Sequence, residues 1–358
     1  MNGIERAKRT LNFEPTDRVA IYSHLRNPAT IEKVTGMDFW ADPWRATVKA
    51  YQALEIDMVK GIAVPVTGKV RPGYRVNPTQ YGMYKVEPDL RTLEEVVEYA
   101  KGVPSDEEMR RDYDFEKAAE GYEEEWRRHQ EAVGDSTLIC WATGGCFDSN
   151  IDLMGYENLL SGFLLERGAI SAIMRMKATR NRLYAEAIAS KRLSPAIMVC
   201  DDIAYSGALM VSPEIMREEF IPNLKYMIEP FKKAGIKVIF HSDGNLTELL
   251  DDLVEVGIDG LHPMEPKAGM SLNEVKKKYG MPGSEPRLVL LGNVCCSTTL
   301  PRGTVEDVKR EVRECIDAAS PGGGYFIATS SMMGPDIPVE NVLAFYDTAK
   351  EYGRRANE

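Results

Sequence analysis

Short apolar runs alternate with longer segments of helical periodicity along almost the whole chain. Eight of these runs have the length and the β-branched or apolar content of buried strands. They cover residues 18–23, 56–62, 136–142, 195–200, 237–241, 257–263, 287–293 and 323–329. Eightfold alternation of strand and helix predicts an α/β protein in which residues 1–358 form a single (β/α)8 TIM barrel.

Two segments do not fit a minimal barrel. The first residues, MNGIERAKRTLNFEP, have the pattern of a polar amphipathic helix, so we expect an N-terminal helical extension and no signal peptide. After the second predicted strand, prolines and glycines in 63–104 precede a charged helical run over 105–133. We therefore expect a helical insertion at about 63–133. Its mixed charges are typical of an exposed helix, and a lid or a docking surface is the alternative.

Capping residues mark several of the expected helix starts. Ser105 and Thr304 each have an acidic residue three positions later, which is the spacing of a capping box. Ser212 precedes a proline, a common first helical residue. These signals support the count of helices between the strands.

The charge balance excludes some classes of partner. Lysine and arginine total 44 against 55 aspartates and glutamates, a formal charge of −11 spread along the chain. This acidity argues against nucleic acid and against an anionic membrane surface, and no apolar run is long enough to span a bilayer. The six cysteines show no CxxC pair or framework spacing. We expect reduced thiols and a cytoplasmic location.

Candidate chemistry gathers where predicted strands end. The run IKVIFHSDGN ends an apolar strand with His241 and then Asp243, and a helix is expected to begin at Asn245. Ligands of parallel α/β folds bind at the carboxyl ends of strands, and a helix start there favours an anion or an oxygen-rich ligand. His241 is the leading functional candidate, with a satisfied core histidine as the alternative.

The fourth predicted strand ends in CDDIAYSG. Adjacent aspartates on a strand cannot both point inward, so at most one of Asp201 and Asp202 is expected to face the site. An inward Asp202 could donate a proton or stabilise developing charge. The alternative is that these acids cap a helix or bind loop amides. Tyr205 follows on the same rim.

Two further strand ends carry donor atoms. His262 and Glu265 flank Pro263 in HPMEP, and Pro266 restricts Glu265 to extended geometry. A structural salt bridge is the competing role for Glu265. Cys295 and Cys296 follow the seventh predicted strand; a buried thiol is usually inert packing, and a thiolate ligand for zinc is the alternative.

Motifs over nearly the whole chain resemble the uroporphyrinogen decarboxylase superfamily, which includes corrinoid-dependent methyltransferases. The resemblance is densest after residue 195. The matching pieces are ERAKRTLNFEPTDRV, GCFDSNIDLMGYENLL, DDIAYSGALMVSPEIMREEFIP, HSDGNL, GIDGLHPMEPKAGMSL, GNVCCSTTL and GGGYFIATSSMMGPDIPVENVLAFYDTAKEYG. It implies a (β/α)8 barrel with its site at the carboxyl ends of the strands, in agreement with the strand count.

Departures from the family patterns separate its branches. The decarboxylase pattern RQAGRY after the first strand reads IYSHLRNP here, so Arg26 alone remains to bind a polycarboxylate. Asp57 is a weak match to that branch's central aspartate. The branch that makes methyl-coenzyme M has His-x-Cys-Gly at the fifth strand and a further cysteine after the eighth. Here Asp243 replaces the first cysteine, and Ser330 or Ser331 the second.

These replacements imply a site of nitrogen and oxygen donors. Zinc is a candidate cofactor, with His241, Asp243, Glu265 and Cys295 as its expected ligands. Such a site would suit polarising an oxygen rather than activating a thiol. Arg26, Trp141, Asn293 and Met332, near the strand ends, are the expected substrate-binding residues.

The resemblance therefore implies a methyltransferase that moves a methyl group from a methoxylated donor to the corrinoid of a separate corrinoid protein. The departing oxygen needs positive charge or a proton, and His241, Asp202, Tyr205 and His262 are the expected catalytic residues. Three alternatives stay open: porphyrinogen decarboxylation, methyl transfer from a corrinoid protein to a thiol, and a tetrapyrrole-binding module without activity. A homodimer is a further expected partner by analogy with similar barrels.

Overall fold

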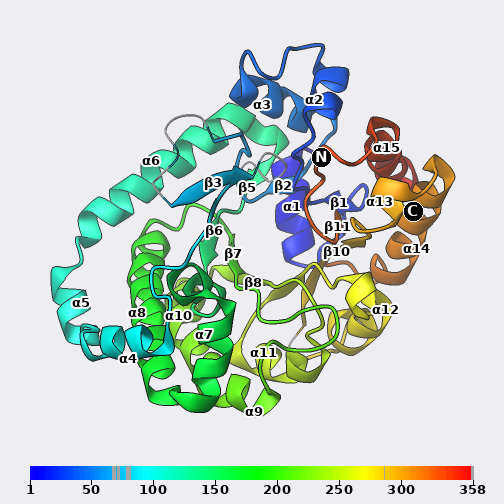
Figure 1. The fold of residues 1–358 in the computed structure, drawn as a ribbon. Helices are drawn as coiled ribbons and strands as arrows, with labels where there is room; N and C mark the ends of the chain where they lie inside the picture. The colour runs from blue at the N-terminus through cyan, green and yellow to red at the C-terminus, as the bar shows by residue number, and fades with distance from the viewer. Residues whose placement is uncertain (67–69, 71–72, 78–81, 286, 356–358) are drawn as a thin grey trace.

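A mostly parallel sheet lies at the centre of the molecule, surrounded by helices (Figure 1). The computed structural model describes residues 1–66, 70, 73–77, 82–285 and 287–355. Seven strands form one sheet in the order β1-β11-β10-β9-β8-β7-β6, and every pairing in it is parallel. Their bounds are β1 Ala20–Ile21, β6 Ala142–Gly144, β7 Ala196–Cys200, β8 Lys237–His241, β9 Gly260–His262, β10 Val289–Val294 and β11 Tyr325–Thr329.

Two short strands extend this pairing beyond β1. β2 (Met58–Val59) pairs in parallel with β5 (Leu138–Ile139), and Tyr22 after β1 forms a parallel bridge with Met58. Only two residues separate β5 from β6. Each of the eight predicted apolar runs overlaps at least one of these strands, and the run 136–142 covers β5 and the first residue of β6. The α/β class is therefore confirmed, and the arrangement is consistent with the predicted (β/α)8 barrel.

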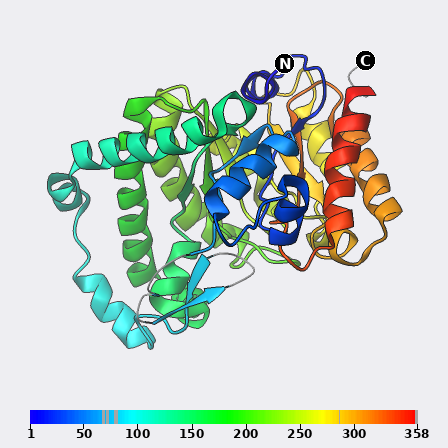
Figure 2. The same cartoon turned by 90° about the horizontal axis from the view of Figure 1, so that it is seen from above.

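Helices cover the outer side of the strands (Figures 1 and 2). Their bounds are α1 Gly3–Leu11, α2 Pro28–Thr35, α3 Pro43–Ala53, α4 Leu93–Lys101, α5 Asp106–Asp112, α6 Phe115–Val133, α7 Ile151–Leu165, α8 Arg167–Lys191, α9 Pro213–Ile215, α10 Ile221–Lys233, α11 Leu250–Val256, α12 Leu272–Val275, α13 Thr299–Arg302, α14 Val305–Ala319 and α15 Val339–Arg355. Within the described residues, none of them combines the length and the apolar content that crossing a bilayer requires.

Side chains of the strands alternate between two hydrophobic clusters. In β7, Ala196 and Met198 belong to an inner cluster, whereas Ile197 and Val199 pack in the outer core against the helices. This alternation follows from the two-residue period of a strand. Because both faces are buried, the strands read as nearly continuous apolar runs. The inner cluster consists of Ala7, Leu11, Ala20, Tyr22, Met58, Leu138, Cys140, Ala196, Met198, Ile239, Val289, Leu291, Phe326 and Ala328.

The predicted N-terminal helix is present as α1, capped by Asn2, whose side chain accepts a hydrogen bond from the Glu5 amide. Ala7 and Leu11 place α1 against the inner cluster, at the end of the sheet where the strands begin. Arg6 on α1 also donates to the buried carboxylate of Asp57 at 2.6 Å, and Arg18 donates to the same carboxylate at 2.7 Å. Asp57 therefore fastens the helical extension to the start of β2.

The segment between β2 and β5 contains more than helices. An antiparallel hairpin of β3 (Tyr74–Asn77) and β4 (Gly82–Lys85) precedes α4, α5 and α6. Figure 2 shows this hairpin toward the opposite end of the molecule from α1. Parts of the predicted insertion, residues 67–69, 71–72 and 78–81, lie outside the described residues. The lid and docking roles stay predictions.

The capping predictions have mixed outcomes. Capping boxes are present at Ser105 and Thr304, and Ser212 caps α9. The expected helix start at Asn245 is wrong: its side chain accepts only from the Thr247 amide, and α11 begins at Leu250 after a short 3-10 turn. Asparagine side chains readily form such local turns in place of a helix cap.

Asp57→Asn should lower the free energy of unfolding by about 3–5 kcal/mol, because it leaves two buried guanidinium groups without their shared carboxylate. Urea unfolding followed by circular dichroism measures the change. Asp17→Asn is the matched control, since Asp17 binds the same Arg6 but its side chain is 46% exposed, and its cost should stay below about 1 kcal/mol. Equal losses in the two variants would contradict this account.

Candidate active site

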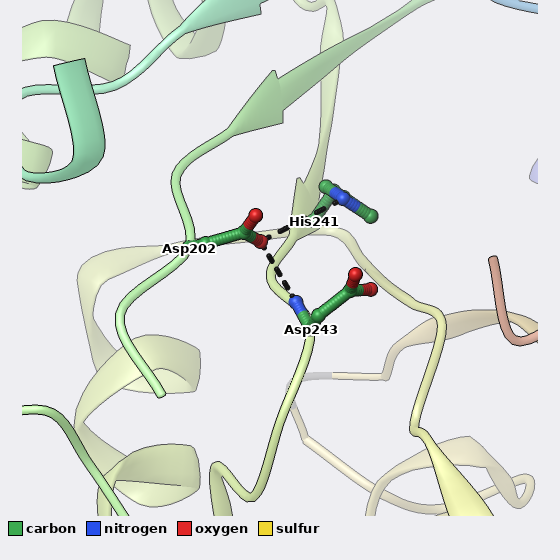
Figure 3. A group of neighbouring side chains, drawn as sticks. All are labelled: Asp202, His241 and Asp243. Carbon is green, nitrogen blue, oxygen red and sulfur yellow. Dashed lines mark hydrogen bonds and ion pairs between the residues drawn. The ribbon is translucent and has the colours of Figure 1, made fainter. Parts of the chain in front are cut away.

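Three donor side chains meet where β7 and β8 end. His241 is the last residue of β8, Asp202 lies two residues after β7, and Asp243 lies two residues after His241. Strand pairing aligns Cys200 with His241 and His241 with His262, so the ends of β7, β8 and β9 stand at one level. Because these neighbouring parallel strands end at the same level, the residues that follow them lie close together. We call Asp202, His241 and Asp243 the rim group (Figure 3).

The Asp202 carboxylate contacts both other members of the rim group (Figure 3). Its Oδ1 accepts a hydrogen bond from the backbone amide of Asp243 at 2.9 Å and lies 3.8 Å from Nε2 of His241. One ligand atom from each of the three side chains lies within 4.8 Å of the others. The His241 side chain is 17% exposed and that of Asp202 43%, so the group is open to solvent on one side.

Asp201 and Asp202 have different roles, as their adjacency on the chain predicts. Asp201 is fully buried and accepts hydrogen bonds from the amides of Cys146, Phe147 and Asp148. It therefore anchors the loop after β6, which is the loop-amide role expected for one of the pair. Asp202 turns toward His241 and Asp243.

His262 fixes the second nitrogen of His241. The two Nδ1 atoms are 2.6 Å apart, so one must carry the proton and donate to the other. The His262 ring also packs edge-on against Tyr22, with ring centroids 5.1 Å apart. This contact leaves Nε2 of His241 directed at Asp202 and fixes the orientation of the ring.

Burial sets the protonation of the rim group. Burial lowers the pKa of His241 to about 4, against the raising influence of the Asp202 charge, so the imidazole is neutral at pH 7. Burial raises the pKa of Asp243 to about 7, and the charges of Asp202 and Glu265 raise it further. Oδ1 of Asp243 is buried and has no hydrogen-bond partner among the described residues. Asp243 can therefore hold either a proton or a cation near neutral pH.

The donor chemistry of the rim group suits a cation that accepts nitrogen and oxygen ligands. It offers a neutral imidazole nitrogen and two carboxylates, and the unpartnered Oδ1 of Asp243 is an available ligand atom. Two residues of the expected zinc set lie outside this close group. Glu265 accepts weakly from the Gly244 amide at 3.4 Å, and Sγ of Cys295 accepts from Thr298 at 3.0 Å.

Comparison with known proteins agrees with the predicted relationship. A family profile described as Uroporphyrinogen decarboxylase (URO-D) matches residues 45–352. The chain belongs to the uroporphyrinogen decarboxylase family. Among solved structures it is similar to a methyltransferase from Methanosarcina mazei, with a TM-score of 0.68, 20% identity, and coverage of 98% of this chain and 99% of the other. At that identity the similarity shows a shared fold. No curated protein matches the chain.

The remaining predicted site residues of this family member occupy varied positions. Tyr205 is 56% exposed in the loop after β7. The ring of Trp141 packs against Tyr122 and His129 of α6, in the outer core. The amide of Asn293 donates to the Met264 carbonyl at 2.8 Å and so holds the loop after β9. Met332 is half-buried in the loop after β11.

Several site residues of this family member are missing from the sequence-based set. His24, Lys60 and Asp148 each interact electrostatically with a predicted residue. Besides burial, the charges of His262 and His241 lower the pKa of His24, the charge of Asp202 raises that of Asp148, and the charge of Lys60 lowers that of Asp243. For His24 and Lys60, the two-residue alternation of a strand contained a signal. His24 and Lys60 lie two residues beyond the inner-cluster residues Tyr22 and Met58, and so face the same side. Asp148 begins a short 3-10 helix after β6 that only tertiary packing places near Asp202.

Asp243→Asn should stabilise the protein more at pH 8 than at pH 4. The carboxyl titrates near pH 7 when folded and near 3.8 in its ordinary state, so between these values the folded state holds more protons than the unfolded state. The wild-type free energy of unfolding therefore falls as pH rises through this window, whereas asparagine has no proton to lose. At about 1.4 kcal/mol per pKa unit, the gain is on the order of a few kcal/mol.

Chemical unfolding of both proteins with a chelator present, from pH 4 to pH 8, measures this difference. The difference should be smaller in an Asp202→Asn background, because that substitution removes a charge that raises the pKa of Asp243. A difference independent of pH would contradict the assignment.

Proposed function

We propose that the protein is a corrinoid-dependent methyltransferase that moves a methyl group from an O-methyl donor to a corrinoid protein. The family assignment and the fold shared with a methyltransferase support this proposal. The observation that carries it is the rim group, in which two carboxylates and an imidazole stand together with no thiolate among them. Such a set suits a substrate that reacts at oxygen.

An ether methyl is hard to displace because the departing oxygen is a poor leaving group. The reduced corrinoid of the partner supplies the nucleophile that takes the methyl group. As the carbon–oxygen bond breaks, its electron pair stays on oxygen, and the carboxyl of Asp243 is positioned to give that oxygen a proton. A pKa of about 7 suits a general acid at neutral pH. Asp202 orients Asp243 through its backbone amide, and His262 orients His241.

A bound cation offers a second route to the same stabilisation. Asp202, His241 and Asp243 would hold it, with zinc as the candidate, and it would supply positive charge next to the departing oxygen. In that case Asp243 would be ionised and would act as a ligand instead of an acid. The two versions differ in metal content, which can be measured.

The rival functions make different demands on this site. Decarboxylation of a porphyrinogen needs several cations for its carboxylates, and Arg26 alone remains of the arginine-bearing pattern after the first strand. Transfer to a thiol needs a metal site rich in thiolates, which the rim group lacks. A corrinoid protein, a small methyl donor, a cytoplasmic setting and a homodimer complete the proposal.

Purified protein incubated with a reduced corrinoid protein and a panel of methyl ethers should give the absorbance of methylated corrinoid. His241→Ala and Asp243→Asn should each lower kcat/KM by about 100-fold or more, the usual size of a lost acid–base contribution. Asp202→Asn should reduce turnover far more than stability. Asp252→Asn, on α11 away from the rim group, is the control and should leave turnover unchanged.

Methylation that is undiminished in both variants would remove the rim group from the mechanism. Carbon dioxide released from a porphyrinogen, without methylation from any ether, would favour the decarboxylase. Methyl transfer from a methylated corrinoid to a thiol, but from no ether, would favour the thiol branch. Tight tetrapyrrole binding without any product would favour a binding module.

Metal analysis should find about one zinc ion per chain if the cation version holds, and His241→Ala and Asp202→Asn should each abolish retention. Cys295→Ser is the informative comparison. We expect this variant to retain zinc, because Sγ of Cys295 already accepts a hydrogen bond from Thr298. Loss of zinc would instead show that Cys295 is one of the ligands. Metal-free protein with full activity would leave only the proton-donor version.

A further inference from the structure

Lys60 points into the inner face of the sheet near the rim group. Met58 belongs to the inner cluster and Val59 to the outer core, so strand alternation turns Lys60 inward, beyond Met58 toward the carboxyl end. Its charge reaches groups from several strands. Burial is the main influence on the pKa of these groups, and the Lys60 charge lowers the pKa of all of them: His24, Cys140, Cys200, His241, Asp243 and His262.

This ammonium group has no anion of its own. Lys60 is half-buried, and in the described part of the chain it forms no hydrogen bond or ion pair. A partly desolvated charge without a partner costs free energy. The inner-face residue two positions earlier, Met58, belongs to the apolar inner cluster and offers this ammonium group no counter-charge. An anion supplied by a ligand would satisfy it.

His24 stands beside Lys60. The parallel bridge between Tyr22 and Met58 places the residues two positions later, His24 and Lys60, at the same level on adjoining strands. Nε2 of His24 is buried without a hydrogen-bond partner among the described residues. Burial lowers the pKa of His24, and the charges of Lys60 and Arg26 lower it further. The ring is therefore neutral and has one nitrogen available as a donor.

The opposite side of the site is acidic. Asp148, Asp202, Asp243 and Glu265 follow β6, β7, β8 and β9, whereas His24, Arg26 and Lys60 follow β1 and β2. An anionic ligand would be repelled by the first set and attracted by the second. Charge therefore orients any substrate that carries an anionic group at one end.

We propose that the methyl donor carries a carboxylate, held by Lys60 and His24, so that its methoxy group faces Asp202 and Asp243. This inference rests on the proposed methyl transfer. It adds a substrate class, methoxylated carboxylic acids, and two substrate-binding residues.

Calorimetric binding of benzoate tests the carboxylate site without any methyl transfer. Wild-type protein should bind benzoate, and Lys60→Met should weaken binding by about 10- to 100-fold, the usual effect of losing a charge-assisted contact. Lys60→Arg should retain most of the affinity because it keeps the charge. Lys233→Met, whose lysine is 69% exposed on α10, is the control and should bind benzoate as the wild type does.

Turnover then separates this inference from the proposed function. 4-Methoxybenzoate should donate its methyl group with a kcat/KM at least 10-fold above that of neutral 4-methoxybenzamide, and Lys60→Met should remove this preference. Equal turnover of acid and amide, with benzoate binding unaffected in Lys60→Met, would overturn the carboxylate site and leave methyl transfer standing. Benzoate binding that depends on Lys60, with no methyl transfer from any ether, would refute the proposed function and leave the anion site.

Discussion

Parallel strand register is the constraint on which the site depends. Cys200, His241 and His262 are aligned partners on three adjoining strands, so the chain leaves β7, β8 and β9 at one level. Residues after those strands consequently meet although they are distant in the sequence. A shift of one residue in β8 would turn His241 to the outer core and place Phe240 toward the inner face. The buried apolar partners on both faces of β8 prevent that shift.

Burial then shifts the protonation equilibria of the side chains at this site. His241 and His262 share one proton between their Nδ1 atoms and are otherwise held neutral. Asp243 is buried and lies near two other carboxylates, and both effects raise its pKa to about 7. The free energy for this arrangement comes from the surrounding fold. The fully buried Asp201 is an example, because it fixes the adjacent loop through three backbone amides.

The presence of oxygen donors in place of thiols favours a substrate that reacts at oxygen. A thiolate-rich zinc site favours soft partners, whereas an imidazole with two carboxylates favours charge or proton donation to oxygen. The cationic residues after β1 and β2 complement this acidic side. Together they give the site two ends of opposite charge, and a donor with a methoxy group at one end and a carboxylate at the other would match both.

The sequence by itself determined the α/β class, the eight apolar runs in which the parallel strands lie, the N-terminal helix and the strand-end position of His241, Asp202 and Asp243. It could do so because a strand buried on both faces leaves an apolar run, and because its polar exit residues stand out against that run. Tertiary structure decided the rest. It selected Asp202 over Asp201, paired His241 with His262, directed Trp141 toward α6, and brought Asp148 near Asp202. These choices depend on register between strands and on loop packing, which are long-range contacts that no local pattern of residues encodes.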